Sequence, residues 1–491
     1  MSSIPTFAVV GAVNHGKSSV VSTLAENDQV VTSQMPGETV DCKRFALGDL
    51  FAFIDTPGFQ NATEALEELE PAAQARDPLA SFQEFINRHR GDPAYEAECY
   101  LFEPVVRGGG ILYVVDGSKP VLDIHLSEME VLRITGAPRL AIINRTSHDD
   151  HVADWKRRLG QHFNAVREFN AHHATFADRI ELLDTLAGIE QAWKPKLSLA
   201  VQHFRDEWGT RLDRSATIVG ELLAGCLQHR ETALLPADTE AHRKQLSGEL
   251  KERYMRAVAA METKAHDGLI RCFLHKLVKT GGSAEHLFAS DLFSDETWQL
   301  FGLDSRQLLG AGAAAGAAIG GSLDIITVGH TFLMGTAIGA AIGAGGALFL
   351  GRARPELNVD MPTDAKGVAG TLTGLLPKRF RLGGKALAVG PYPALNFPWI
   401  LLDRAVATLA YVLNRAHARR DAVTIHAQEL RAVLDRHNVT SAHWPAEERR
   451  QFERLFTAMR RGKYGDPQRV ELHALLRKRL EVVSGERMRF E

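Results

Sequence analysis

The sequence predicts an N-terminal α/β domain followed by a mainly α-helical C-terminal region, and two observations support this. In the first part, apolar runs typical of buried strands, such as Phe7–Val10 and Ile111–Val115, alternate with helical patterns. Beyond about Leu182, apolar and charged positions instead recur with helical spacing, as in Leu212–His229. We therefore expect a sheet-containing domain over residues 1–190 and helices over most of the remaining chain.

The composition is that of an ordinary folded protein, with 45% hydrophobic and 24% charged residues. The 491 residues suffice for about two to four domains. A formal net charge of −3 gives no clear nucleic-acid signal. The four cysteines are too scattered for a metal site or a disulfide framework, which favours a reducing compartment. No signal-peptide pattern opens the sequence, so we expect a cytoplasmic protein.

The most informative stretch is the loop after the first apolar run. Gly11 is followed by four residues and then by Gly16-Lys17-Ser18, after which Ser19–Ala25 has a helical pattern. The two glycines allow the backbone to curl round a phosphate, and the N-terminus of the helix adds its positive dipole. Lys17 can then reach the β- and γ-phosphates, and the Ser18 hydroxyl can ligate Mg²⁺. The strand, loop and helix together favour a phosphate-binding loop over a chance glycine-rich turn.

A second motif, Asp55-Thr56-Pro57-Gly58, follows the candidate strand at residues 50–54. A carboxylate at the end of a strand beside a phosphate loop can hold Mg²⁺ through water, and a glycine just after it can offer its N–H to the γ-phosphate. An upstream threonine can complete the metal shell only while the γ-phosphate is present, so hydrolysis would release that segment. These motifs predict a nucleotide-dependent switch.

The segments Gly11–Ser19, Pro36–Asp41 and Asp55–Gly58 resemble the first three motifs of the Era-like GTPases. The second motif of that family commonly reads Pro-Gly-Thr-Thr-Arg-Asp, so Thr39 falls on the switch threonine. The resemblance implies a P-loop NTPase G domain with a doubly wound, mostly parallel sheet that binds GTP or GDP with Mg²⁺. The expected catalytic residues are Lys17, Thr39 and Gly58, and the expected metal ligands are Ser18, Thr39 and Asp55.

Two further residues bear on hydrolysis. Asn14 falls where many Era-like proteins carry an asparagine that helps to bind K⁺ beside the phosphates, so K⁺ is a second candidate cofactor. The alternative is an asparagine that only shapes the loop. Phe59 takes the place at which Ras-like enzymes carry the glutamine that orients the attacking water. We therefore expect slow intrinsic hydrolysis that an ion, a homodimer formed through the G domain, or another partner activates.

The predicted base-binding motif departs from the family. Asn144-Arg145-Thr146-Ser147 replaces the usual Asn-Lys-x-Asp, so Ser147 stands where a carboxylate would accept from guanine. We expect this change to weaken the preference for guanine by about 1–3 kcal/mol, unless Asp149 or Asp150 substitutes. Downstream, Asn170-Ala171-His172 resembles the family's Ser-Ala-Lys, with the Ala171 N–H facing the base carbonyl. The expected nucleotide-binding residues are Gly11, Asn14, His15, Gly16, Lys17, Ser18, Ser19, Asn144, Arg145, Ser147, Asn170, Ala171 and His172.

An unusually long connection at residues 59–107 contains helical, amphipathic segments. We interpret it either as an extended switch II insertion or as surface decoration. The G domain over 1–190 is then followed by a helical bundle or stalk over 191–305, a hydrophobic hairpin over 306–352 and a helical domain over 353–491. This order resembles a bacterial family in which an Era-like GTPase precedes a large C-terminal domain of unassigned function.

The hairpin prediction depends on composition, because residues 308–351 are almost all Ala, Gly, Ile and Leu. Glycine recurs every four residues, which on a helix gives a face without side chains that favours close helix packing, a glycine zipper. Residues 331–350 are uncharged and long enough to span a bilayer. We expect insertion into membrane lipid, with the protein peripheral to or anchored at the inner membrane. The alternatives are a buried soluble hairpin or a flexible linker.

Beyond Pro355 the sequence is loop-like as far as a Pro-rich, aromatic stretch at Gly390–Trp399, which either meets a membrane interface or caps the next helix. A strong helix at Ile400–Arg419 and further amphipathic helices follow. The basic clusters Lys378–Arg381 and Arg477–Arg479 either touch anionic lipid or are solvated.

Three functions remain open on the sequence alone. The first is a membrane-associated GTPase switch. The second is a soluble switch that acts on RNA or the ribosome, although no recognisable RNA-binding module is present. The third is a nucleotide-binding scaffold that barely hydrolyses.

Overall fold

The computed structural model describes residues 4–12, 15–24, 43–75, 77–145, 151–171, 174–235, 239–273, 291–311, 359–364, 385–414 and 433–485. The chain divides into two compact units. The first unit is Met1–Gly209 with Leu413–Asp421, and the second is Thr210–Val412 with Ala422–Glu491.

The first unit is built on a six-stranded sheet with the strand order β2-β3-β1-β4-β5-β6. Every neighbouring pair is parallel except β2 with β3. The strands are β1 (Thr6–Val10), β2 (Lys43–Leu47), β3 (Phe51–Asp55), β4 (Gly110–Asp116), β5 (Arg139–Asn144) and β6 (Ala165–Phe169). The predicted mostly parallel α/β sheet is therefore confirmed.

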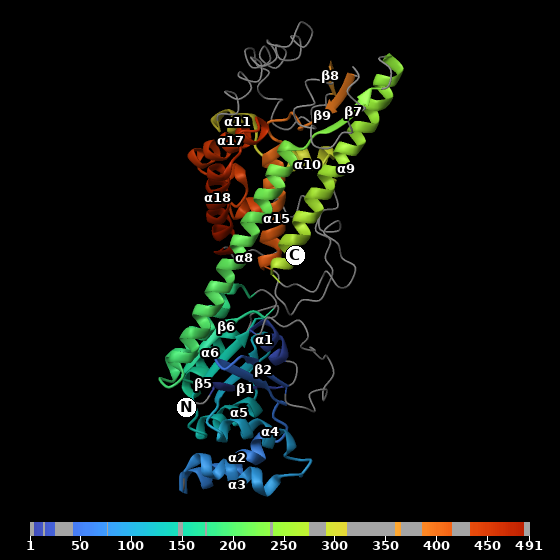
Figure 1. Ribbon diagram of the computed structural model, residues 1–491. Helices are drawn as coiled ribbons and strands as arrows, with labels where there is room; N and C mark the ends of the chain where they lie inside the picture. Colours follow the sequence, from blue (N-terminus) through green and yellow to red (C-terminus); the bar gives the residue numbers. More distant parts are fainter. Residues whose placement is uncertain are drawn as a thin grey trace. The chain divides into compact units, whose positions relative to one another are not determined.

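Helices cover both faces of this sheet (Figure 1). They are α1 (Lys17–Leu24), α2 (Ala62–Ala75), α3 (Pro78–His89), α4 (Glu96–Val106), α5 (Asp123–Ile134), α6 (Val152–His162) and α7 (Phe176–Ile189). Along β1, Ala8 and Val10 join a core that includes residues of α2 to α6, whereas Phe7 and Val9 join a core that includes residues of α1 and α7. Because successive strand side chains point to opposite faces, one apolar run is buried on both sides, as a doubly wound sheet requires.

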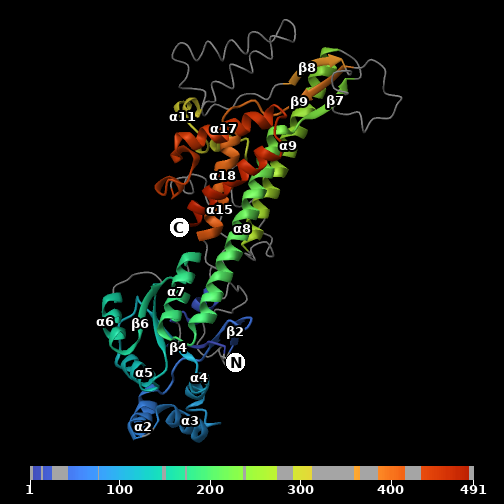
Figure 2. The ribbon, with the colours of Figure 1, turned by 60° about the vertical axis from the view of Figure 1, so that its left-hand side comes forward.

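The long connection between β3 and β4 is helical, as predicted, and comprises α2, α3 and α4. In both views α4 and α5 lie against the sheet, whereas α2 and α3 lie farther out (Figures 1 and 2). Aromatic side chains hold these helices together, since the Phe102 ring lies 4.8 Å from that of Phe82 and 5.7 Å from that of Phe85. The insertion is thus part of the core of the first unit.

The second unit is mainly helical, as predicted. Its helices are α8 (Lys194–Gln228, which begins in the first unit), α9 (Glu240–Cys272), α10 (Asp295–Leu300), α11 (Ser305–Gly310), α15 (Phe397–Asn414), the 3₁₀ helix η5 (Ser441–His443), α17 (Ala446–Arg460) and α18 (Asp466–Gly485). In the second unit α8 and α9 run side by side (Figures 1 and 2). Apolar side chains of α15, including Trp399, Ile400 and Leu401, are fully buried and form the centre of this unit.

A small antiparallel sheet in the second unit was not expected. Its order is β7-β9-β8, formed by β7 (Glu231–Leu235), β8 (Val359–Asp364) and β9 (Lys385–Val389). The prediction of a loop-like chain beyond Pro355 is therefore wrong for β8 and β9. These strands are short, β8 contains Pro362, and its register with β9 shifts between Asp360 and Thr363. Such a segment has little of the regular alternation that identifies a strand in a sequence.

The Pro-rich stretch before α15 belongs to the core. Tyr392, Phe397 and Trp399 are at most 2% exposed, and the Trp298 ring lies 5.4 Å from that of Tyr392. The Ile400 N–H donates to the Asn396 carbonyl at 3.0 Å, so the stretch leads directly into the first turn of the helix. Of the two interpretations, the structure favours the helix cap over a membrane-facing edge.

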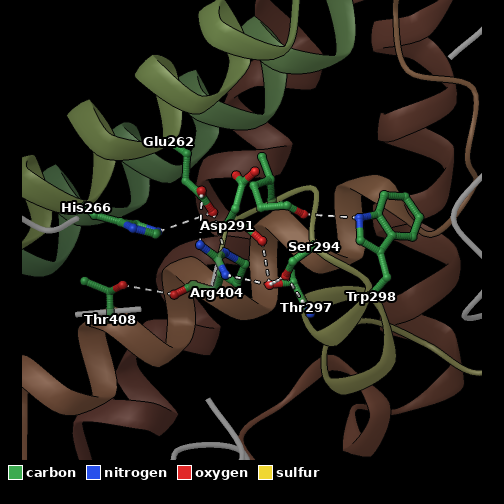
Figure 3. Close-up of polar contacts among 9 residues, drawn as sticks. Glu262, His266, Asp291, Ser294, Thr297, Trp298, Arg404 and Thr408 are labelled. Carbon is green, nitrogen blue, oxygen red and sulfur yellow. Dashed lines mark hydrogen bonds and ion pairs between the residues drawn. The ribbon is translucent and has the colours of Figure 1, made fainter. Parts of the chain in front are cut away.

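A buried ion pair joins α9 to α15 (Figure 3). Arg404 donates to both carboxylate oxygens of Glu262, at 2.6 and 3.2 Å, and to the Thr297 hydroxyl at 3.2 Å. Arg404 and Glu262 are 3% and 5% exposed. His266 lies one turn along α9, and burial lowers its pKa to about 4. Because this ion pair is buried away from water, its hydrogen bonds have to be made with neighbouring protein groups.

The predicted glycine-zipper hairpin lies almost entirely outside the described residues, which stop at 311 and resume at 359. Across the part of the chain that the structure describes, no helix combines the length and the apolar character needed to cross a membrane. Of the two basic clusters, residues 378–381 also lie outside the described part. Arg477 pairs with Asp213 at 3.1 Å, and Lys478 pairs with Glu448 at 2.6 Å, so this cluster is engaged within its own unit.

Candidate nucleotide-binding site

The loop after β1 lies against the ends of β4 and β5. Gly11 has a φ of 144°, and a Cβ atom there would lie 2.1 Å from the Val114 carbonyl oxygen. Gly16 has a φ of 88°, and its Cβ would lie 2.2 Å from the Asn144 side-chain nitrogen. Both positions combine a left-handed backbone with a close approach, so only glycine fits. This geometry explains why the motif requires its two glycines.

Lys17 begins α1, and its side chain crosses the loop. The Nζ atom donates to the carbonyl oxygens of Gly11 and Ala12, at 2.9 and 3.1 Å. Burial lowers the pKa of Lys17, while the negative charges of Asp55 and Glu128 oppose that shift. The amine is thus held within the loop that would cradle the phosphates, where its charge is poorly solvated and available to an anion.

Ser18 and Asp55 come from different elements and meet at this loop. The Ser18 hydroxyl, at the start of α1, donates to Asp55 Oδ2 at 2.7 Å, and Asp55 is 2% exposed at the end of β3. Within the described residues, no group of three or more His, Cys, Asp or Glu side chains could hold a metal ion. One hydroxyl and one carboxylate fit Mg²⁺, which usually completes its shell with water and phosphate oxygens. Thr39 lies outside the described residues.

The segment after β3 is fixed close to the loop. The Thr56 N–H and hydroxyl both donate to the Val9 carbonyl, at 3.3 and 2.8 Å. Gly58, two residues further on, is buried. The Phe59 side chain is 8% exposed and its ring lies 6.2 Å from that of Phe102 on α4. Phe59 therefore packs in the core, and slow intrinsic hydrolysis stays a prediction.

Asn144, at the end of β5, connects the phosphate loop to the loop after β6. Its amide donates to the His15 carbonyl at 3.4 Å, and its side-chain oxygen accepts from the Ala171 N–H at 3.2 Å. The Ala171 carbonyl in turn accepts from the Thr23 hydroxyl at 2.9 Å. In this structure the Ala171 N–H satisfies the fully buried Asn144 oxygen, and its contact with a base carbonyl stays a prediction.

The structure describes some of the other residues that were predicted to bind the nucleotide. Arg145 donates to the Glu168 carboxylate at 2.9 Å. Asn170, two residues after Glu168, is half-buried. Ser19, on α1, is buried. Asn14, Ser147 and His172 lie outside the described residues.

His15 contributes to the loop chiefly through its backbone. Its ring is 4% exposed and lies 5.4 Å from the ring of His125 on α5 and 6.5 Å from that of Trp155 on α6. Burial, with Lys119 as the next cause, lowers the pKa of His15 to about 3, so the ring is neutral at physiological pH. Nothing in the sequence indicates that the His15 side chain is buried between helices, because a polar residue in a loop is usually exposed.

Sequence reasoning missed a group of buried acids close to the loop. The hydroxyl of Tyr113 on β4 donates to Oε2 of Glu128 on α5, at 2.6 Å. Burial raises the pKa of Glu128 to about 7, against the opposing effects of the Tyr113 hydrogen bond and the Lys17 charge. Glu98, on α4, is fully buried. Each of these acids lies in an ordinary amphipathic helical pattern, so nothing in the sequence distinguished it from a solvated residue.

Comparisons with known proteins agree with this geometry. Residues 6–145 match a family described as "50S ribosome-binding GTPase", and residues 156–477 match "Domain of unknown function (DUF3482)". The chain is 34% identical over 168 residues to "Probable GTP-binding protein EngB" of Ligilactobacillus salivarius, covering 31% of this chain and 85% of that protein. It is 38% identical over 69 residues to "GTPase Der" of Agathobacter rectalis, covering 13% of this chain and 16% of that protein.

The chain thus spans only about one sixth of the Der protein that it matches. Among solved structures, a GTP-binding protein from Sulfolobus solfataricus in complex with GDP is 17% identical over 39% of this chain and 53% of that chain, with a TM-score of 0.22. A likeness this distant has no bearing on function. The matched families cover the phosphate loop and most of the helical region. The chain belongs to the DUF3482 family, and its N-terminal unit is a P-loop GTPase domain of the bacterial type.

Proposed function

We propose that the protein is a molecular switch that binds and hydrolyses GTP. The observation that carries this proposal is the meeting of Lys17, Ser18 and Asp55 at a glycine-bounded loop, with Ser18 and Asp55 in direct hydrogen bond. That arrangement supplies a cation for the phosphates and two oxygen ligands for a metal. The relatives named as GTPases and GTP-binding proteins support guanine as the base.

In this proposal Ser18 and Asp55 would hold Mg²⁺, joined by Thr39 in the GTP state. The ion would neutralise negative charge on the bound phosphates. Lys17 binds the same phosphates, and the Gly58 N–H contacts the γ-phosphate, so loss of that phosphate frees the segments that carry Thr39 and Gly58.

Efficient hydrolysis at this site requires an additional activating group, because the Phe59 side chain has no polar atom that could orient the attacking water. We propose that K⁺ held with the aid of Asn14, pairing of two G domains, or another partner provides it. The base-binding loop would rest on Asn144, with Arg145, Ser147, Asn170, Ala171 and His172 around it.

Calorimetry of the full chain with GTP, GDP and ATP, in potassium and in sodium buffer with Mg²⁺, tests this proposal. We expect GTP and GDP to bind more tightly than ATP, by about tenfold rather than more, because Ser147 lacks the usual carboxylate. Turnover should be slow in sodium buffer and faster in potassium buffer. Equal binding of ATP and GTP, or no binding of either, would contradict the proposal.

We also propose that the switch acts at a membrane through residues 308–351, on the basis of their uncharged, glycine-periodic sequence. The alternative is action on the ribosome, which the description of the family matched by residues 6–145 favours. Both can be compared in one sedimentation experiment with the full chain, anionic liposomes and 50S subunits.

The full chain should sediment with liposomes, and Ile338→Glu with Ile342→Glu should abolish this, because a charge within an apolar segment is costly to insert. The control is Leu199→Glu, which puts a glutamate at an exposed apolar residue of α8 and should change nothing. Sedimentation with 50S subunits but not with liposomes would replace the membrane proposal with the ribosomal one.

A further inference from the structure

The segment that carries Gly58 is fastened on both sides. On one side, Thr56 is bound to the Val9 carbonyl of β1 through its N–H and its hydroxyl. On the other side, the N–H groups of Gln60 and Asn61 both donate to one oxygen of Glu98, each at 2.7 Å. Only three residues separate the two anchors. The backbone at Gly58 therefore has little freedom as long as both hold.

Glu98 is well suited to be the second anchor. It lies in the first turn of α4 and is fully buried, and it faces the N-terminus of α2, which begins one residue after Asn61. A carboxylate at a helix N-terminus is stabilised by the free N–H groups and by the helix dipole. Its second oxygen, Oε2, is buried and has no hydrogen-bond partner among the described residues. The N–H bonds from Gln60 and Asn61 therefore hold this side chain in place.

A second contact ties the same segment to the same helix. Phe59, between Gly58 and Gln60, packs its ring against Phe102, one helical turn beyond Glu98 on α4. A carboxylate and an aromatic ring on one face of α4 thus fix three consecutive residues. We call this segment, residues 56–61, the switch segment. It cannot move unless its contacts with α4 break or α4 moves with it.

We propose that Glu98 is a positioning residue for the γ-phosphate: it holds the backbone beyond Gly58 so that the Gly58 N–H is aimed at that group. This rests on the proposed function of the site. The insertion formed by α2, α3 and α4 would then help to distinguish GTP from GDP, because only GTP carries the phosphate that Gly58 would contact. The contact between Glu98 and the switch segment then depends on the nucleotide, which makes the insertion part of the switch.

The test uses the full chain with Glu98→Ala, Glu98→Gln and Glu98→Asp. The matched control is Glu103→Ala, which removes an acid on the same helix that pairs with the exposed Arg107. Affinities for GDP and for a non-hydrolysable GTP analogue are measured by calorimetry, together with kcat and KM for GTP.

For Glu98→Ala we expect the affinity for the GTP analogue to fall about tenfold, as loss of hydrogen bonds to a charged group predicts, while that for GDP stays within about twofold. Glu98→Gln keeps an oxygen for both N–H groups and should lose only about threefold, because neutral bonds are weaker. Glu98→Asp withdraws the carboxylate by one carbon and should resemble Glu98→Ala in direction. Glu103→Ala should match the wild type.

Equal losses of affinity for GDP and for the GTP analogue would show that Glu98 has a purely structural role. Unchanged affinities would likewise contradict the positioning role. If Glu98→Ala does not fold, Glu98→Asp and Glu98→Gln decide the question by the same ratio of the two affinities. The failure of the broader proposal is distinguishable, because the wild type would then bind neither nucleotide. Wild-type binding of both nucleotides, with the wild-type ratio in every variant, would overturn this inference alone.

Discussion

Replacement of Lys17 by alanine is expected to weaken GTP binding by about a hundredfold or more, which is the loss of two charge-assisted hydrogen bonds to phosphate. The carbonyl oxygens of Gly11 and Ala12 already hold the amine within the loop that would receive the phosphates. Calorimetry with GTP and Mg²⁺ measures the effect directly.

The matched control for this prediction is Lys194→Ala. Lys194 is exposed at the start of α8 and lies in the same unit, so its loss should leave GTP binding unchanged. GTP binding by Lys17→Ala at wild-type strength would show that the loop does not bind phosphate through this amine. Unaltered cellular function of the Lys17→Ala variant would instead favour the nucleotide-binding scaffold that barely hydrolyses.

Replacement of Glu262 by alanine is expected to destabilise the second unit by about 3–5 kcal/mol, because it leaves the Arg404 guanidinium buried without its counter-charge. Replacing both partners by apolar residues of similar size, Glu262→Leu with Arg404→Met, should recover most of that loss. Urea unfolding, followed by amide hydrogen exchange in α9 and α15, reports on this unit separately from the first.

An exposed ion pair in the same unit provides the control. Glu447 and Arg450 pair at 2.8 Å on α17, and both side chains are more than half exposed. Glu447→Ala should therefore cost less than about 1 kcal/mol. If Glu262→Ala costs no more than this, the buried pair is not a determinant of stability.

The N-terminal sheet and the phosphate loop could be predicted because their signals are local. The apolar run, the glycine-bounded loop and the helix lie within 18 consecutive residues, from Phe7 to Leu24. The helical character of the insertion and of the second unit follows from spacing in the same way. Each of these features depends on neighbours in the sequence.

The features that escaped prediction depend on distant partners. Glu98 meets Asn61 across 37 residues, and Arg404 meets Glu262 across 142. The small sheet pairs β7 with β9 across the whole of α9 and beyond. A carboxylate in an amphipathic helix has the same sequence signature whether it is solvated or anchors a distant backbone. Only the fold distinguishes the two cases.

One side chain, Asn144, holds the loop for the phosphates and the loop for the base at once. Two halves of a ligand that depend on a shared support do not contribute independently to its affinity. Inorganic triphosphate and guanosine, measured apart, would therefore give binding free energies that do not sum to that of GTP. In the proposed function, the phosphate and base subsites would therefore form one thermodynamic unit, because a single side-chain amide bonds to both loops.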